Sequence, residues 1–178
     1  MVNYFEFYGL PLSFNPDAGV IKQQFYKFSK LYHPDFYINE SEEKQAEVLE
    51  LSTLNNKAYQ VLSDPHKRLP YILELKGLLS EGEGYVLPQS FLMEMMEVNE
   101  ALMDLQFDPD PVKLESIKNE VAVIEQGITD EIAAVTASFE AQDLPAQEQS
   151  LLALKDLYYR SKYLLRIRES INKATNKI

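Results

Sequence analysis

Apolar residues recur at spacings of three and four along most of the chain, which is the period of a helix with one buried face. Strict alternation of apolar and polar residues, the pattern of a half-buried strand, is not sustained anywhere. The pattern predicts helices over about residues 3–8, 17–32, 41–62, 64–77, 88–106, 111–141 and 145–174. We therefore expect an all-α protein.

Local signals set the ends of these helices. Asp17 is a good N-cap, Asp64 and Pro65 supply an N-cap and a first-turn proline, and Gly77 is a stop signal. Short turns rich in Asp and Pro at 108–111 and 143–145 separate the last three helices. Long helices joined by short turns favour an antiparallel three-helix bundle.

Three glycines within residues 77–87 make that stretch the best candidate for a linker. We expect one domain over 1–76 and a second over 88–178. Charge differs between the two parts: residues 1–76 carry 8 Lys and Arg against 10 Asp and Glu, whereas residues 77–178 carry 9 against 18. This asymmetry indicates two modules with different partners.

Composition excludes several classes of function. A net charge of −11 argues against nucleic-acid binding. No apolar run reaches about 18 residues and no secretory signal opens the chain, so we expect a cytoplasmic protein without a membrane span. The chain has no Cys, and its two histidines, His33 and His66, lack a nearby nucleophile. We expect neither an enzyme nor a bound metal or cofactor.

The tripeptide His33-Pro34-Asp35 lies between two helical patterns. Pro34 disfavours the helical conformation at His33, so the preceding helix must end there and the tripeptide forms the tip of a helical hairpin. Exposed loop residues held on a helical scaffold usually serve recognition, although a purely structural turn is the alternative. The preceding helix carries lysines away from its apolar side, at Lys22, Lys27 and Lys30.

Together with segments 4–11 and 56–68, these features closely resemble a J-domain, the module of DnaJ-type co-chaperones, over residues 3–76. The resemblance implies docking on a DnaK-type chaperone and stimulation of its ATPase. It assigns contact with that chaperone to His33, Pro34 and Asp35 and to the basic face formed by Lys22, Lys27 and Lys30. J-domains are not themselves enzymes.

The helix after Pro88 carries apolar residues around more of its circumference than one buried face requires. Residues of one stripe suffice to face the core, namely Phe91, Met95, Val98, Leu102 and Leu105. A second apolar set, Leu92, Met96 and Met103, lies about 120° around the helix, and Glu97, Glu100 and Asp104 lie beyond it with Met93. These additional apolar residues either bind a partner or pack against both neighbouring helices.

Segment 91–100, the order of the modules and the opening Tyr-Phe…Gly-Leu-Pro are similar to HscB, the family of co-chaperones of iron–sulfur cluster assembly. The resemblance implies HscA or another DnaK-type chaperone and the cluster scaffold IscU as partners. It assigns scaffold binding to Leu92, Met93, Met96, Glu97, Glu100, Asp104 and Tyr159, with Tyr158 as an alternative to Tyr159. A J-domain co-chaperone serving a different client remains the second interpretation.

Overall fold

The computed structural model describes residues 2–80 and 82–176, and every regular element within them is helical. The chain divides into two compact units, residues 1–79 and 80–178. This fold confirms the all-α prediction: a helical hairpin with flanking short helices is followed by a bundle of three long helices.

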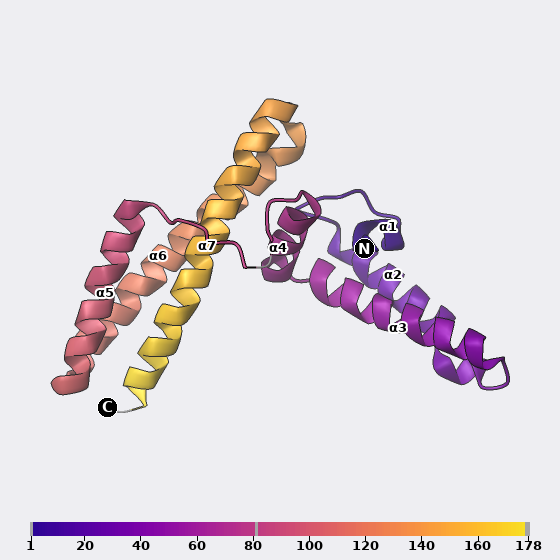
Figure 1. Cartoon of the computed structure of the whole chain (residues 1–178), viewed down its shortest axis with the longest axis horizontal. Coiled ribbons are helices and arrows are strands. Elements are labelled where there is room, and N and C mark those ends of the chain that lie inside the picture. The colour runs from indigo at the N-terminus through magenta and orange to yellow at the C-terminus, as the bar shows by residue number, and fades with distance from the viewer. Residues whose placement is uncertain (1, 81, 177–178) are drawn as a thin grey trace. The chain divides into compact units, whose positions relative to one another are not determined.

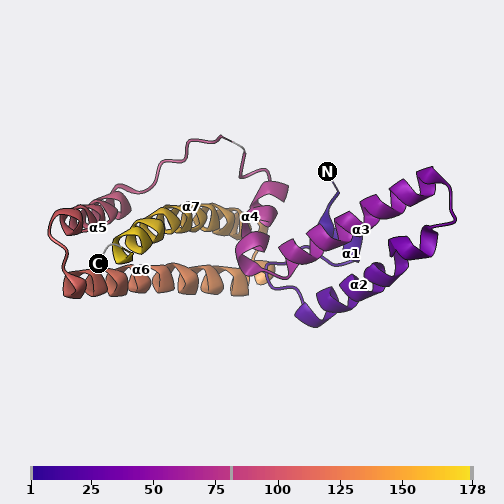
Figure 2. The same ribbon diagram turned by 90° about the horizontal axis from the view of Figure 1, so that it is seen from below.

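Unit 1 is built around the antiparallel helices α2 (Ala18–Leu31) and α3 (Glu42–Leu62), which lie side by side in Figures 1 and 2. The short helix α1 (Tyr4–Tyr8) packs against α3. Helix α4 (Pro65–Leu75) follows α3 in the chain and also packs against it. The loop between α2 and α3 contains a single 3-10 turn, η1 (Pro34–Tyr37).

Side-chain caps explain where these helices begin. The carboxylate of Asp17 accepts a hydrogen bond from the backbone N–H of Val20, and the hydroxyl of Ser41 accepts one from that of Lys44. Each cap satisfies an N–H group that the first helical turn leaves without a partner. Gly77 has φ of 71°, a left-handed conformation that glycine adopts without strain, and it follows the C-terminus of α4.

A buried asparagine joins three helices of unit 1. Asn55 is only 1% exposed, and its side-chain oxygen accepts a hydrogen bond of 2.8 Å from the hydroxyl of Tyr8 in α1. Its amide nitrogen donates to the carbonyl of Phe25 and to the hydroxyl of Ser29, both in α2. The surrounding core is apolar and includes Phe5, Ile21, Val48, Ala58, Leu62, Ile72 and Leu73.

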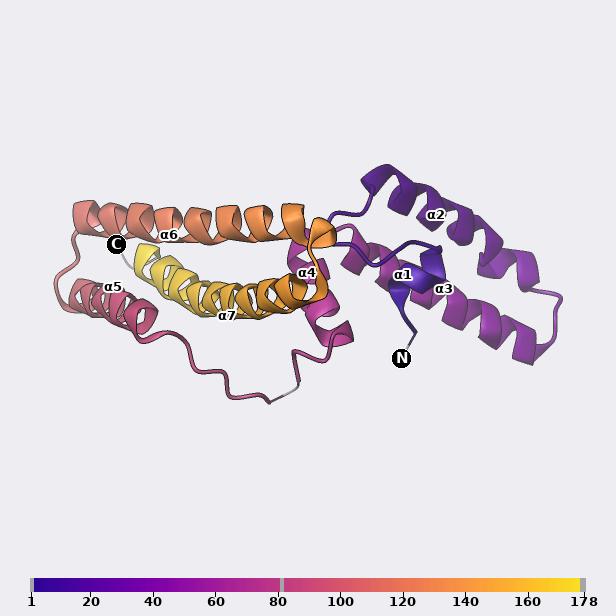
Figure 3. The ribbon, with the colours of Figure 1, turned by 90° about the horizontal axis from the view of Figure 1, so that it is seen from above.

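Unit 2 is the expected bundle of three long helices, α5 (Gln89–Phe107), α6 (Pro111–Ser138) and α7 (Leu144–Thr175), with a 3-10 turn, η2 (Phe139–Ala141), before α7. Figure 3 shows α6 and α7 running alongside each other, with the shorter α5 covering only part of their length. The core comprises Phe91, Met95, Val98, Leu102, Leu105, Leu114, Ile117, Val121, Ile128, Leu157, Leu164, Ile167 and Ile171.

The residues expected to form a linker fall on both sides of the division between the units. Residues 77–79 group with unit 1 and residues 80–87 with unit 2. Within the second group, Tyr85 contacts α7 through its ring and its hydroxyl. Part of the glycine-rich stretch is therefore attached to the bundle.

Candidate protein-binding sites

The loop between α2 and α3 exposes the tripeptide that the sequence singled out. The side chain of His33 is 51% exposed and that of Asp35 is 78% exposed. The Nδ1 atom of His33 accepts a hydrogen bond of 3.3 Å from the backbone N–H of Asp35 and lies 3.8 Å from its carboxylate. Because Nδ1 acts as an acceptor, the ring proton of a neutral His33 is on Nε2. Both side chains remain available to a partner.

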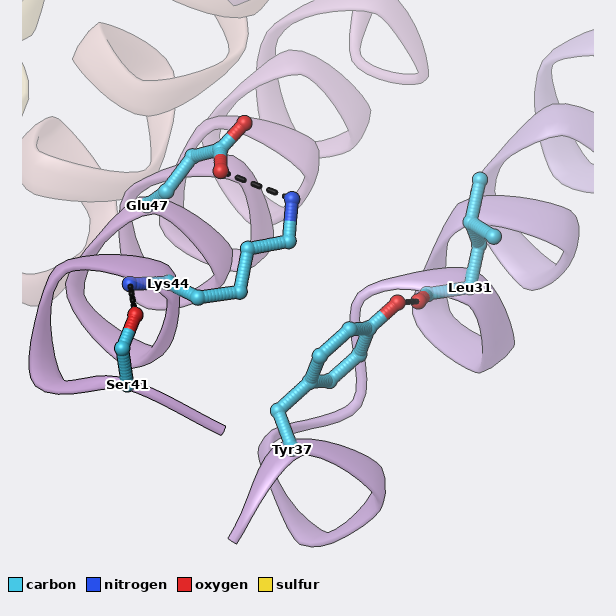
Figure 4. Close-up of polar contacts among 5 residues, drawn as sticks. All are labelled: Leu31, Tyr37, Ser41, Lys44 and Glu47. Atoms are coloured by element: carbon cyan, nitrogen blue, oxygen red, sulfur yellow. Dashed lines mark hydrogen bonds and ion pairs between the residues drawn. The ribbon is translucent and has the colours of Figure 1, made fainter. Parts of the chain in front are cut away.

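Two hydrogen-bonding side chains outside the tripeptide hold this loop in place. The hydroxyl of Tyr37 donates to the carbonyl of Leu31 at 2.8 Å, which fastens the 3-10 turn to the end of α2 (Figure 4). Gln45 donates from its amide nitrogen to the carbonyls of Ile38 and Glu40 at 3.0 and 2.9 Å. The loop is therefore exposed but braced from both helices.

The start of α3 is braced as well. Ser41 caps its first turn, and the ammonium group of Lys44 lies 2.7 Å from the carboxylate of Glu47 one turn further on (Figure 4). That ion pair raises the pKa of Lys44 above its usual value through a hydrogen bond and charge attraction. Sequence reasoning missed the contributions of Tyr37 and Gln45, because their partners are backbone carbonyls that no local motif reveals.

The lysines of α2 form an exposed basic face. Lys22, Lys27 and Lys30 are all exposed, and none forms an ion pair with a residue that the structure describes. Phe25 and Phe28, by contrast, are half-buried and contact Tyr59 and Phe7. The apolar side of α2 thus faces the core of unit 1. The three lysines can interact with an acidic surface, although the ammonium of Lys27 also lies 5.6 Å from the ring centroid of Phe28.

In unit 2, α5 buries one stripe and leaves a second apolar strip in solvent. All five residues assigned to the first stripe are buried, at 5% exposure or less. Met93, Met96 and Met103 are 58–59% exposed, and Leu92 is half-buried. The strip therefore does not pack against both neighbouring helices, and Leu92, Met93, Met96 and Met103 are called the α5 strip below.

Acidic residues border the α5 strip. Glu97 and Glu100 are exposed and form no ion pair with any described residue, whereas Asp104 lies 3.3 Å from the ammonium of Lys113 in α6. A hollow of about 470 Å³ next to the strip is lined by Ser90, Phe91, Met93, Glu94, Glu97 and Arg160. An exposed apolar strip rimmed by free carboxylates has the character of a protein-binding surface.

The two candidate tyrosines of α7 have different surroundings. Tyr159 stacks on Tyr85, with ring centroids 4.4 Å apart and planes 6° apart, and Tyr85 belongs to the segment that leads into α5. The ring of Tyr158 contacts Tyr159 edge-on, and the ammonium of Lys162 lies near both rings, 5.6 and 5.9 Å from their centroids. Of these two tyrosines, Tyr159 is the one that contacts a described residue of the segment leading into α5, and the sequence did not predict its partner Tyr85.

Two further structural properties bear on the chemistry of the chain. Among residues 2–80 and 82–176, no group of three or more His, Cys, Asp or Glu side chains is arranged to hold a metal ion. No helix in that same part of the chain is long and apolar enough to cross a membrane.

Known protein families match the sequence of each unit. The family model for the DnaJ domain matches residues 3–71, and the model for the HSCB C-terminal oligomerisation domain matches residues 87–172. The chain is 33% identical over 146 residues to the co-chaperone protein HscB homolog of Vibrio parahaemolyticus, covering 76% of this chain and 85% of that relative. These matches define a J-domain protein with a second helical domain.

Other relatives and two solved structures point to the same family. The chain is 37% identical over 111 residues to an HscB homolog of Vibrio cholerae, covering 62% of this chain and 65% of that relative's length. HscB from Vibrio cholerae matches with a TM-score of 0.68 and 26% identity over 99% of both chains. Human HscB matches with a TM-score of 0.74 and 26% identity, over 100% of this chain and 84% of that one. The chain belongs to the HscB family.

Proposed function

We propose that the chain is a co-chaperone with two protein-binding sites, one in each unit. The first, in the domain expected over 1–76, stimulates the ATPase of an HscA- or DnaK-type chaperone. The second, in the domain expected over 88–178, binds an IscU-type iron–sulfur scaffold. The observation that carries the proposal is that each unit leaves exposed or half-buried, on helices and a braced loop, the residues at which the family resemblance predicts contact. The proposed function requires no covalent chemistry by the chain and is expected in the cytoplasm.

The braced loop supports the chaperone-binding role. The exposed carboxylate of Asp35 can accept a charge-assisted hydrogen bond from an arginine of the partner. Because Tyr37 and Gln45 already hold the loop, little conformational freedom is lost when a partner binds it. The free lysines of α2, Lys22, Lys27 and Lys30, would steer an acidic surface toward the loop, an effect that salt weakens.

The α5 strip supports the scaffold-binding role. Leu92, Met93 and Met96 would bury their apolar side chains in the complex, and methionine adapts well to an irregular partner surface. Glu97 and Glu100 lie at the rim, where charges mainly set the rate of association, and Asp104 shares this border. Tyr159 would contribute an aromatic edge from α7.

Holding both sites in one chain would raise the effective concentration of scaffold at the chaperone.

The test of the proposed function measures chaperone stimulation and scaffold binding separately. Single-turnover ATP hydrolysis by a DnaK-type chaperone should accelerate when this protein is added, and calorimetric titration should detect binding of a purified IscU-type scaffold. ATPase stimulation without scaffold binding would favour a J-domain co-chaperone of a different client pathway, and the absence of both would refute the proposal.

A further inference from the structure

The segment that leads into α5, residues 82–87, is fastened to α7 by one aromatic residue. The ring of Tyr85 stacks on that of Tyr159 with almost parallel planes, 4.4 Å between centroids. Its hydroxyl donates a hydrogen bond of 2.8 Å to the carboxylate of Asp156, one turn before Arg160. Tyr85 therefore contacts α7 at two points, one aromatic and one polar.

Glu83 and Lys155 reinforce this attachment. The ammonium of Lys155 lies 2.5 Å from one carboxylate oxygen of Glu83 and 5.7 Å from the ring centroid of Tyr85. The hydroxyl of Tyr159 donates to the other oxygen of Glu83 at 3.4 Å. The hydrogen bond from Lys155 lowers the pKa of Glu83, so its carboxylate is charged at neutral pH. Tyr159 is thus held both on the face of its ring and at its hydroxyl.

The same network reaches the α5 strip. Asp156 forms an ion pair of 2.6 Å with Arg160, and the guanidinium of Arg160 lies 5.5 Å from the ring centroid of Phe91 in α5. Phe91 and Arg160 line the hollow that Met93 and Glu97 also border. A continuous chain of contacts therefore links the orientation of Tyr159 to the surface beside the strip.

The bundle core does not depend on Tyr85. Tyr85 is half-buried and lies outside the buried cluster that fills the bundle, against which Leu87 of the same segment packs. Without the stack, Tyr159 would keep only its 3.4 Å hydrogen bond to Glu83, its edge contact with Tyr158 and the nearby ammonium of Lys162 among the contacts described, so its half-buried ring would have more rotamers open to it. Fixing a side chain before binding removes part of the entropy cost of the complex.

We infer that Tyr85 is a positioning residue, which holds Tyr159 in one orientation for contact with the scaffold. The inference rests on the proposed function, because it takes the scaffold as the partner of Tyr159. Tyr85 is expected to act through Tyr159 and not by touching the scaffold itself. Its loss should weaken scaffold binding by about two- to tenfold, the effect of freeing one side chain.

The test is a double-mutant cycle with full-length protein and a purified IscU-type scaffold, read by calorimetry. Tyr85→Ala should weaken binding, whereas Tyr85→Phe, which keeps the ring, should restore affinity to within about twofold of the original. Val86→Ala is the matched control, because Val86 is 85% exposed in the same segment. In a Tyr159→Ala background, Tyr85→Ala should cause no further loss.

NMR of ¹³C-labelled tyrosine supplies a readout independent of affinity. The ring signals of Tyr159 should move when Tyr85 becomes Ala, because the stacked ring no longer shields them, and should stay near their original positions in Tyr85→Phe. Circular dichroism checks that each variant is folded.

The outcomes separate the inference from the proposed function. If the unchanged protein does not bind scaffold, the scaffold-binding proposal fails, and the inference fails with it. If it binds but Tyr85→Ala has the original affinity, or Tyr159→Ala does, only the inference is wrong. Additive losses in the cycle would also overturn it, since they would mean that Tyr85 contacts the scaffold directly.

Discussion

Removing the apolar side chains of the α5 strip should weaken scaffold binding while leaving the bundle folded. The change is Leu92→Ala combined with Met96→Ala. Met96 is 59% exposed, so most of its surface is free to be buried by a partner, and Leu92 is half-buried. Neither belongs to the buried cluster of the bundle.

The expected magnitude follows from the surface still available. Burying a whole Leu or Met side chain contributes about 1.5–3 kcal/mol. With about three fifths of its surface to bury, Met96 would contribute about 1–2 kcal/mol, and Leu92 would add less than about 1 kcal/mol. The sum, about 1–3 kcal/mol, corresponds to a loss of affinity of about fivefold to a hundredfold, at about 1.4 kcal/mol per decade.

The assay is calorimetric titration of an IscU-type scaffold into the original protein and the variant, with thermal melting to verify folding. Val123→Ala is the control, because Val123 is a 73% exposed apolar residue on α6 with no proposed contact. The control should keep the original affinity. A folded double variant that also keeps it would refute the reasoning and favour a different client.

Three further predictions concern single residues. Asp35→Asn should abolish stimulation of chaperone ATP hydrolysis in a single-turnover assay while changing the free energy of unfolding by less than about 0.5 kcal/mol, because the side chain is 78% exposed; retained stimulation would contradict its assignment. Asn55→Ala should lower the free energy of unfolding of unit 1 by about 1–3 kcal/mol in urea denaturation, since one buried and two partly buried hydrogen bonds are lost while the hydroxyl of Tyr8 keeps the backbone carbonyl of residue 55 as an acceptor; a loss below about 0.5 kcal/mol would be inconsistent with that network. Burial, aided by Asp156, raises the pKa of Tyr85 to about 12, so the stability it contributes is complete below pH 10 and is lost as the pH rises through 12. The difference in absorbance at about 295 nm between the original protein and Tyr85→Phe should show this titration, and a midpoint near pH 10 would contradict the burial of its hydroxyl.

The sequence predicted the helices well because their ends depend on local chemistry. Asp17, Asp64, Asp110 and Asp143 each accept hydrogen bonds from the N–H groups that follow them, as such caps do in most contexts. The buried stripe of α5 also followed from its period alone. The 3-10 turn at Pro34–Tyr37 was not predicted, because so short an element leaves no periodic pattern.

The contacts that brace the sites could not be predicted in the same way. Tyr85 meets Tyr159 across 74 positions, and Asn55 meets Tyr8 across 47. A pattern along the chain does not say which polar residues meet when the helices pack. The family resemblance supplied candidate positions such as Tyr159, but it gave no reason why that side chain would be held in place.

If the two sites act together only when one chain carries both, a mixture of single-site variants should not replace the original protein. Chaperone ATP hydrolysis is measured with scaffold at limiting protein concentration, comparing the original protein with an equimolar mixture of two full-length variants. One variant carries Asp35→Asn, and the other carries Leu92→Ala with Met96→Ala, so each keeps one site. The original protein should give scaffold-dependent stimulation that the mixture does not reproduce. A mixture as effective as the original protein would show that the two sites act independently, so that one chain need not carry both.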